Sequence, residues 1–336
     1  MKKYNSLDLY KLFASICVIA IHTNPLNGCD SPFTDIFKAV TSTAVPFFFL
    51  TSGFLLGKKM VYPYNGISNL FVIKKYLLKI FKWYIIWSAL YMPLAVHDYI
   101  RSGDSVIKCI FLYLRGLLLL GQNYNSWMLW YLLSTIYALI FIYVLLKKKI
   151  MLKNIVLISV GIYMISISMD WLVLQKTLPD FFMLLARVIK KTFLTGGLFK
   201  GAFYISVGLL LASENIEKWK YKGAWLLLAV GFTAKCMLTN VLAESLVIPV
   251  YVIALFIILV QIDMKDSPWY LIARNISMIV YFIHMYVWTL YYSLVYKQKT
   301  YGLDCFLVTA MVSLLVAAVY LYIRSNKQII KTKVQQ

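Results

Sequence analysis

Long apolar runs separated by short polar stretches make up almost the whole chain. Ten of these runs are long enough to cross the hydrocarbon core of a bilayer as helices, which takes about 20 apolar residues each. They occupy residues 7–23, 35–57, 74–96, 127–146, 154–174, 192–212, 223–240, 245–262, 272–294 and 303–323. The pattern therefore predicts an all-α, polytopic membrane bundle of about ten transmembrane helices.

The composition supports this class, because 62% of the 336 residues are hydrophobic and only 14% are charged. Soluble globular domains do not have this balance. Since no linker rich in proline, glycine or serine divides the chain, we expect one membrane domain over residues 1–324 and a polar cytoplasmic tail over 325–336. A further apolar stretch, 105–120, is short and contains Lys108 and Arg115. It is typical of an amphipathic or re-entrant helix and is not counted as a span.

The formal net charge of +21 does not indicate nucleic-acid binding, because the basic residues alternate between the ends of the predicted spans. Placing the N-terminus in the cytoplasm puts most of them on that side, as the positive-inside rule requires. These clusters lie at residues 2–11, 58–82, 147–153, 218–222 and 324–333. We therefore expect both termini to lie in the cytoplasm. The predicted outer loop 175–200 is also basic. This excess of positive charge either attracts an anionic substrate or a lipid headgroup, or has no functional meaning.

Several common chemistries have no motif in this chain. The five cysteines show no paired spacing, although Cys29 and Cys305 could both lie outside and form a disulfide. There is no cysteine and histidine pattern for a metal, and no glycine-rich motif for a nucleotide phosphate. We also find no pair of interrupted helices that would indicate an inverted-repeat transporter. The sequence thus predicts no metal and no permanently bound cofactor.

The first apolar run carries polar residues along one helical face. Ten residues separate Lys11 from His22, so the two side chains share a face about 16 Å apart, and Asp8 and Ser15 fall on the same stripe. We call this stripe the first polar seam. It cannot face lipid, where ionisable groups cost several kcal/mol. Asp8 is too far from His22 to orient its ring, so we expect it to form a structural pair with Lys11. In the alternative reading, these residues only anchor the helix at the two membrane surfaces.

A second polar seam follows the run at 272–294. Arg274, Ser277, Tyr281, His284 and Trp288 recur at steps of three and four residues, which places them on one helical face. A lone buried histidine is more often a packing residue. Opposite the first polar seam, however, His284 becomes a candidate partner of His22.

Two further groups are candidates for binding. Lys74, Lys75 and Lys79 recur at helical spacing and form either a phosphate-binding stripe or a set of lysines that reach the lipid headgroups. Trp130 and Tyr131, which follow Trp127, form either an aromatic belt at the outer interface or the wall of a pocket.

Pro46 and Ser52 mark a third candidate region, the stretch VPFFFLTSGF. Proline can bend the helix there, and the small residues after it admit a ligand or another backbone. A plain helix-packing notch has the same composition.

Four motifs in this order resemble the acyltransferase-3 superfamily of bacterial membrane O-acyltransferases. They are the spacing of Lys11 and His22, the stretch VPFFFLTSGF, WYL at Trp130, and ISxxxYxxH from Ile276 to His284. HTNPL at His22 and GGLFKGAFYISVGLLLA ending at Ala212 are most similar to the membrane half of vancomycin-resistance serine racemases. We expect no racemase domain in this chain, which ends at Gln336. Asn5 and the lysines Lys74 and Lys75 stand where arginines are usual in the family.

The resemblance implies a protein of the bacterial cytoplasmic membrane. It also implies transfer of an acyl group, expected to be acetyl, from cytoplasmic acyl-CoA to a hydroxyl. The acceptor would be a cell-envelope glycan or another small molecule. His22 would be the base or a transient acyl carrier, because histidine suits proton transfer near pH 7. Ser52 and His284 would support it. The donor's phosphates would bind Lys11 and the stripe at 74–79, and Trp130, Tyr131 and Tyr281 would line the substrate site. The alternatives are a non-enzymatic carrier of serine or small solutes and an inactive scaffold.

Overall fold

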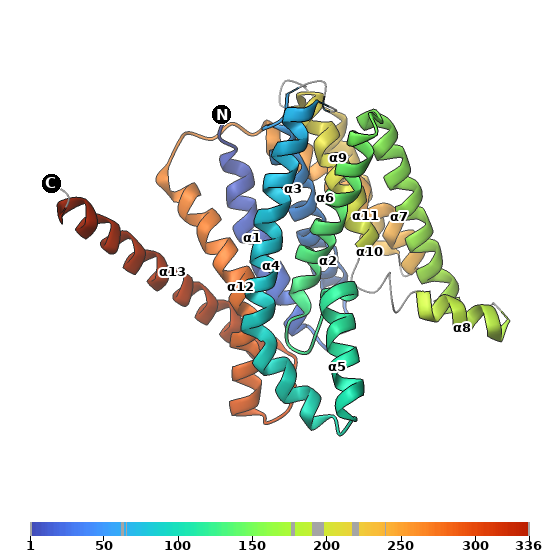
Figure 1. The fold of residues 1–336 in the computed structure, drawn as a ribbon, viewed down its shortest axis with the longest axis vertical. Coiled ribbons are helices and arrows are strands. Elements are labelled where there is room, and N and C mark those ends of the chain that lie inside the picture. The colour runs from blue at the N-terminus through green and yellow to red at the C-terminus, as the bar shows by residue number, and fades with distance from the viewer. Residues whose placement is uncertain are drawn as a thin grey trace. The chain divides into compact units, whose positions relative to one another are not determined.

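The computed structural model describes residues 2–61, 64, 66–175, 179–189, 198–216, 222–238 and 240–334. Every regular element in these residues is a helix, so the predicted all-α class is confirmed (Figure 1). By their internal contacts the residues form two compact units. The first combines residues 1–45 with 262–336, and the second contains residues 46–261. Whether the chain acts as the single domain predicted from the sequence stays a prediction.

The first unit is built from α1 (Asn5–Thr23), α2 (Pro32–Thr41), α12 (Pro268–Val295) and α13 (Leu303–Val334). α12 and α13 form an antiparallel hairpin, and α1 packs against both helices (Figure 1). The buried side chains where the three helices meet are Ile19, Val280, Ala310 and Ala317. Small residues on α13 allow this close packing. α13 continues as a helix through Val334, past the predicted span and through most of the predicted tail.

Helix starts in the first unit follow the expected capping chemistry. Ser267 precedes α12 and its hydroxyl accepts a hydrogen bond from the Trp269 amide, while Pro268 stands at the first helical position. Ser31 and Pro32 begin α2 in the same way. The chain leaves α1 through Asn24, whose φ of 42° lies in the left-handed region that asparagine tolerates. These local signals define where the helices that carry the polar seams begin and end.

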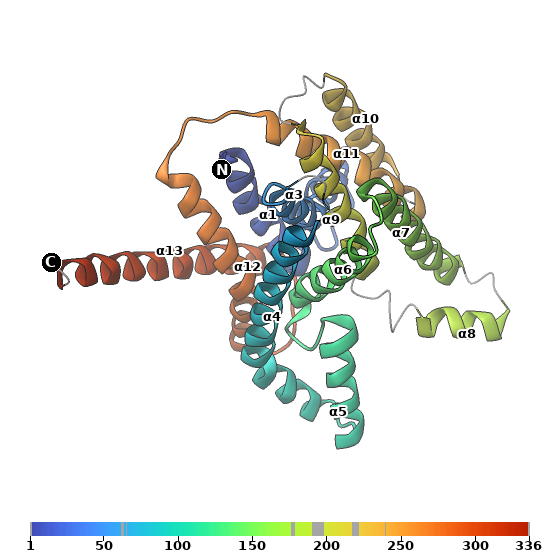
Figure 2. The same ribbon diagram turned by 45° about the horizontal axis from the view of Figure 1, so that its top comes forward.

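The second unit contains the remaining helices. In chain order they are α3 (Ala44–Gly57, from Pro46 on), α4 (Ile67–Arg101), α5 (Val106–Arg115), α6 (Trp130–Lys147), α7 (Leu152–Gln175), α8 (Asp180–Ile189), α9 (Leu198–Ser213), α10 (Gly223–Met237) and α11 (Val241–Gln261). α9 packs between α6 and α7, α4 packs on α6, and α10 and α11 form a closely packed pair (Figure 2). A glycine face lets α3 approach α9: a Cβ on Gly53 would collide with the backbone of Ile205. Gly53 therefore serves as a packing notch.

Each of the ten predicted runs contains a helix, and seven helical stretches of the described residues are long and apolar enough to cross a membrane. They are Asn5–Thr23, Pro32–Gly57, Trp127–Lys147, Leu152–Leu174, Val241–Gln261, Pro268–Val295 and Leu303–Asn326. α9 and α10 are shorter, and six residues of the predicted 192–212 run lie outside the described residues. α4 is long enough, but its lysines and aromatic residues lower its mean hydropathy. The protein is thus a multi-pass membrane protein.

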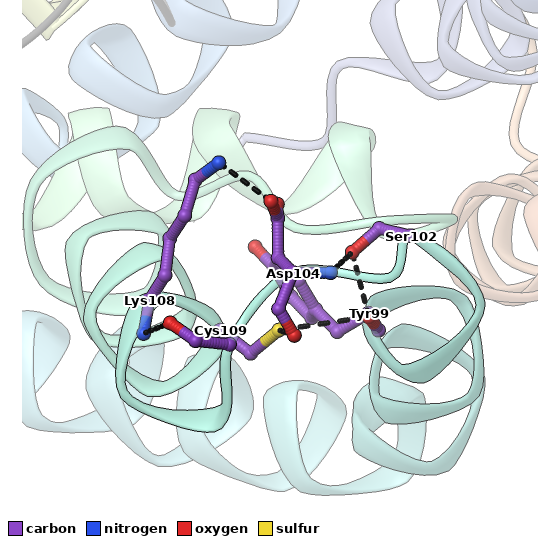
Figure 3. Close-up of polar contacts among 6 residues, drawn as sticks. Tyr99, Ser102, Asp104, Lys108 and Cys109 are labelled. Atoms are coloured by element: carbon purple, nitrogen blue, oxygen red, sulfur yellow. Dashed lines mark hydrogen bonds and ion pairs between the residues drawn. The ribbon is translucent and has the colours of Figure 1, made fainter.

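The stretch 105–120 forms the short helix α5 and a π-helical turn, Gly116–Leu120. This agrees with the prediction of a helix too short to span. Figure 3 shows the turn that leads into it: the Ser102 hydroxyl donates to the Tyr99 carbonyl at 2.7 Å, and Cys109 Sγ lies 3.5 Å from the same oxygen. Lys108 Nζ lies 2.6 Å from Asp104 Oδ1, and this hydrogen bond raises the pKa of Lys108.

Candidate functional site

The two polar seams predicted on separate helices face each other in the first unit. At one end Asp8 of α1 approaches Arg274 of α12, and at the other end the rings of His22 and His284 lie 5.4 Å apart between centroids, inclined by 30°. α1 and α12 therefore run parallel, with their polar faces in contact. Ser15, between the two ends, is fully buried. Residues more than 260 positions apart in the sequence thus form one polar interface inside an apolar bundle.

His284 is held in one orientation by its own helix. Its Nδ1 lies 3.1 Å from the Val280 carbonyl oxygen. Because a carbonyl can only accept, Nδ1 carries the hydrogen, and the neutral ring keeps its lone pair on Nε2. The side chain is 0% exposed, and Nε2 has no hydrogen-bond partner among the described residues. A neutral imidazole fixed in this way presents a basic nitrogen in a buried environment.

His22 lies in the last turn of α1 and is half-buried, so it is more accessible than His284. The end of α1 is tied to the loop between α12 and α13, since the Gly302 amide donates to the Thr23 carbonyl at 2.9 Å. The ring of Tyr281 lies 6.3 Å from that of His284 on the same face of α12. The histidine pair therefore occupies the end of the unit at which this loop closes.

Sequence reasoning missed a cation beside this pair. Lys299, in the loop between α12 and α13, holds its ammonium 5.4 Å from the ring centre of Trp288 and 5.2 Å from that of Tyr301. Lys299 lies at the same end of the unit as His22, because Gly302 of the same loop bonds to the Thr23 carbonyl. Trp288 is fully buried and its indole nitrogen donates to the Thr300 carbonyl at 3.1 Å, which fixes the loop. Loop residues have no helical period, so only the basic and aromatic composition of the loop could have drawn attention to Lys299.

The opposite end of the two polar seams is an ion-pair cluster. Lys11 Nζ lies 2.7 Å from Asp8 Oδ1, which is the pair predicted from their spacing, and Arg274 lies 3.9 Å from the other carboxylate oxygen. Lys11 and Asp8 are only 12% and 16% exposed at the side chain. Asn5, at a position where the family usually has arginine, donates to Asp266 at 3.0 Å and to the Met264 carbonyl at 3.2 Å. Here it connects α1 to the start of α12.

In the second unit, Ser52 belongs to a hydroxyl network. Its Oγ lies 2.9 Å from the Tyr131 hydroxyl, which also donates to the Phe48 carbonyl at 3.3 Å. Tyr76 of α4, which sequence reasoning did not single out, also hydrogen-bonds Ser52. The residues of this network come from three helices, α3, α4 and α6. Its two phenols and one serine hydroxyl are groups that can donate hydrogen bonds to an oxygen.

Aromatic rings surround this network. The ring of Phe49 on α3 lies 4.5 Å from that of Tyr131 and 5.9 Å from that of Trp130, tilted against both. The predicted aromatic pair therefore contacts α3. Its proposed role in lining a substrate site stays a prediction.

Lys74, Lys75 and Lys79 lie on α4 with exposed side chains, as their helical spacing predicted. The structure records no carboxylate beside them within the described part of the chain. Their role toward phosphates stays a prediction. In the basic outer loop, residues 176–178 and 190–197, which include three of its lysines, lie outside the described residues.

The described residues hold no cluster of three histidine, cysteine, aspartate or glutamate side chains suited to a metal ion. All five cysteines are free thiols, so Cys29 and Cys305 are not bridged in this structure.

The first unit of this multi-pass bundle thus brings two histidines together. A family model for the acyltransferase domain, Acyl_transf_3, matches residues 4–323, and the chain belongs to this family. The predicted resemblance is confirmed.

Curated relatives support the second part of the resemblance. An amino-acid racemase of Enterococcus faecalis is 26% identical over 359 residues, which cover 98% of this chain and 48% of that protein. A second amino-acid racemase of that organism is 30% identical over 170 residues, covering 50% of this chain and 22% of its own length. A serine/alanine racemase of Enterococcus gallinarum is 24% identical over 221 residues, 64% of this chain and 30% of that protein. This chain therefore spans about half the length of the relatives it matches. No solved structure matches it.

Proposed function

We propose that the protein is a membrane-bound O-acyltransferase that moves an acyl group, in the simplest case acetyl, from cytoplasmic acyl-CoA to a hydroxyl. The acceptor is a hydroxyl of a cell-envelope glycan or another small molecule. The observation that carries the proposal is the pair of His22 and His284, 5.4 Å apart in a chain of the acyltransferase family. Such a pair provides a general base in a site largely shielded from water.

The proposed step uses His22 as the reacting base, because its ring is the more accessible of the two. The acceptor's hydroxyl proton passes to an imidazole nitrogen while its oxygen bonds to the acyl carbon of the thioester. The bond from carbon to sulfur then breaks, and the coenzyme A thiolate leaves and takes up a proton. As a transient acyl carrier, His22 would itself attack that carbon before the acceptor does. His284, whose ring is fixed by the Val280 carbonyl, is proposed to position the His22 ring.

Two groups on the second unit are assigned to the donor. The exposed lysines Lys74, Lys75 and Lys79 are proposed to bind the phosphates of coenzyme A. Lysine provides a point charge for phosphate rather than the two-pronged contact of arginine. Ser52, with the hydroxyl network around it, is proposed to steady the oxyanion that forms during transfer, because such donors stabilise developing charge.

The proposal is tested with detergent-purified protein, radiolabelled acetyl-CoA and total cell-envelope glycan as acceptor. His22→Gln should lower the transfer rate by roughly 10²–10⁴-fold, the range for loss of a general base. His97→Gln is the matched control, because His97 is exposed beside Asp98 on α4. Equal rates for the two variants, or no binding of coenzyme A by the wild type, would contradict the proposal.

A second candidate function is a carrier of serine or a similar small solute. It is favoured by one observation: the relative that covers 98% of this chain is named an amino-acid racemase, and the match spans 48% of that protein. A carrier requires no affinity for coenzyme A. Saturable uptake of labelled serine into vesicles that contain the purified protein, without acetyl-CoA turnover, would support this function instead.

A further inference from the structure

Three buried polar atoms of the first unit have no hydrogen-bond partner among the residues that the structure describes. They are Nε2 of His284 and the side-chain oxygens of Thr309 and Ser313 on α13. All three side chains are 0% exposed. Hydroxyls within helices commonly bond back to a carbonyl one turn earlier, as Thr23 does to Ile19 at 2.8 Å. Two α13 hydroxyls one turn apart that make no such bond therefore indicate a ligand.

The loop between α12 and α13 defines which residues of the two helices lie opposite each other. Nε1 of Trp288 and Sγ of Cys305 both donate to the Thr300 carbonyl, at 3.1 and 3.4 Å. These two side chains also contact each other, so they lie side by side where the hairpin begins. One helical turn further from the loop, His284 lies four residues before Trp288 on α12, and Thr309 lies four residues after Cys305 on α13. Thr309 is therefore at the level of His284.

The next turn of the hairpin places Val280 at the level of Ser313. The core packing agrees with this register, because Val280 belongs to the buried cluster that includes Ala310 and Ala317. The two unpartnered hydroxyls thus follow the same buried side of the hairpin as the histidine.

The chemistry of these atoms selects the ligand. The lone pair on His284 Nε2 needs a donor, and the hydroxyl of Thr309 can both donate and accept. A hydroxyl group satisfies both, since it donates its hydrogen to Nε2 and accepts from threonine. A carboxylate or phosphate could not donate to Nε2, and an apolar molecule would leave every one of these atoms unpaired.

We propose that His284 Nε2, Thr309 Oγ1 and Ser313 Oγ form a buried site for a hydroxyl group between α12 and α13. The hydroxyl belongs to a bound water or, on the basis of the proposed transfer function, to the acceptor. Thr309 is then a positioning residue that directs the hydroxyl toward Nε2, and Ser313 extends the site by one turn. The site gives His284 a partner for proton exchange.

The chain offers a direct test, because it contains only three histidines. Nitrogen NMR of ¹⁵N-histidine-labelled full-length protein in detergent resolves His22, His97 and His284, with the exposed His97 as internal reference. Thr309→Val keeps the shape of the side chain and removes its hydroxyl. We expect it to shift the His284 Nε2 signal toward that of a nitrogen without a hydrogen bond, with His97 unchanged.

Thermal stability provides the second measurement. Thr309→Val removes the hydroxyl that holds the bound water in the proposed site, so its melting temperature should fall if the hydroxyl there is that of water. Ser159→Ala is the control, because the Ser159 hydroxyl is buried and bonds to the Ile155 carbonyl and to Ser206. It should lower the melting temperature and leave the His284 signal in place.

The outcomes separate the two sources of the hydroxyl. A Thr309-dependent Nε2 signal in the purified protein alone identifies water, and one that appears only on addition of serine, used as a hydroxyl-bearing probe, identifies the acceptor. An Nε2 signal that Thr309→Val does not move under either condition overturns the site. Neither measurement requires acyl transfer, so a wild-type protein inactive with acetyl-CoA would refute the proposed function without refuting this site.

Discussion

Replacing Asp8 by asparagine removes the only carboxylate that the structure places against Lys11 among the described residues. Asparagine has nearly the same shape, so the variant changes charge and little else. The Lys11 side chain is 12% exposed within a transmembrane helix, and its ammonium would keep a full charge without a counter-ion. Arg274, whose guanidinium lies 3.9 Å from the other Asp8 oxygen, would add a second positive charge to the same place.

The size of the effect follows from this burial. Breaking a buried ion pair by removing one partner costs about 3–5 kcal/mol of unfolding free energy. Because the pair keeps some contact with solvent, we expect Asp8→Asn to cost about 3 kcal/mol. Lys11→Met should cost less, since Arg274 stays near the carboxylate. The double variant, which removes both buried charges, should be more stable than Asp8→Asn alone.

The assay is unfolding of the purified protein in mixed micelles by titration with SDS, with the four proteins compared as a double-mutant cycle. The exposed pair of Lys3 and Asp266, with side chains 71% and 64% exposed, is the control and should show little measurable coupling. If Asp8→Asn costs less than about 0.5 kcal/mol, or if its effect and that of Lys11→Met simply add, the reasoning from burial is wrong.

Two further predictions concern packing and pH. Gly53→Ala should destabilise the protein by about 1–3 kcal/mol, because the new methyl group meets the Ile205 backbone. Gly161→Ala is the control: its methyl group would enter open space, so it should not lower the stability in the same unfolding assay. Hydrogen bonds from Lys3 and Asn5 lower the pKa of Asp266, so their contribution is complete above the carboxyl's ordinary pKa and is lost as the pH falls through the lowered value. The protection factors of the N-terminal amides should therefore stay constant down to about pH 5 and fall only in stronger acid. A fall over the same pH range in Asp266→Asn would contradict the assignment.

The helical spacing of polar residues was enough to predict the features that lie on a single helix. The stripe of Asp8, Lys11 and His22 and that of Tyr281 and His284 follow from helical spacing, and so does the Asp8 pair. Which helices meet does not follow from spacing, because α1 and α12 are separated by more than 200 residues and either could bury its polar face elsewhere. The two seams made His284 a candidate partner of His22, and the structure shows that the two rings lie side by side.

The remaining differences have local causes. The run at 35–57 is two helices, because the hydroxyls of Ser42 and Thr43 bond to the carbonyls of Ala39 and Val40 and compete with the helical pattern. Thr309 and Ser313 look like ordinary small residues of a span, and only their lack of a partner in the folded hairpin sets them apart. Tyr76 was hidden among the lysines of α4, and its contact with Ser52 depends on how three helices pack.

The composition of the first unit has a consequence for biogenesis. Its helices come from the first 45 and the last 75 residues of the chain, so α1 leaves the ribosome long before α12 and α13 exist. During translation the ionisable face of α1 must therefore be kept away from lipid while the intervening helices are inserted. The translocon, water or a chaperone would have to shield it during that time. The histidine pair is consequently among the last features to form, and nascent chains stalled before His284 would contain nearly every span without the pair. Pulse-labelled intermediates of increasing length should become resistant to proteolysis around α1 only once α12 has been synthesised.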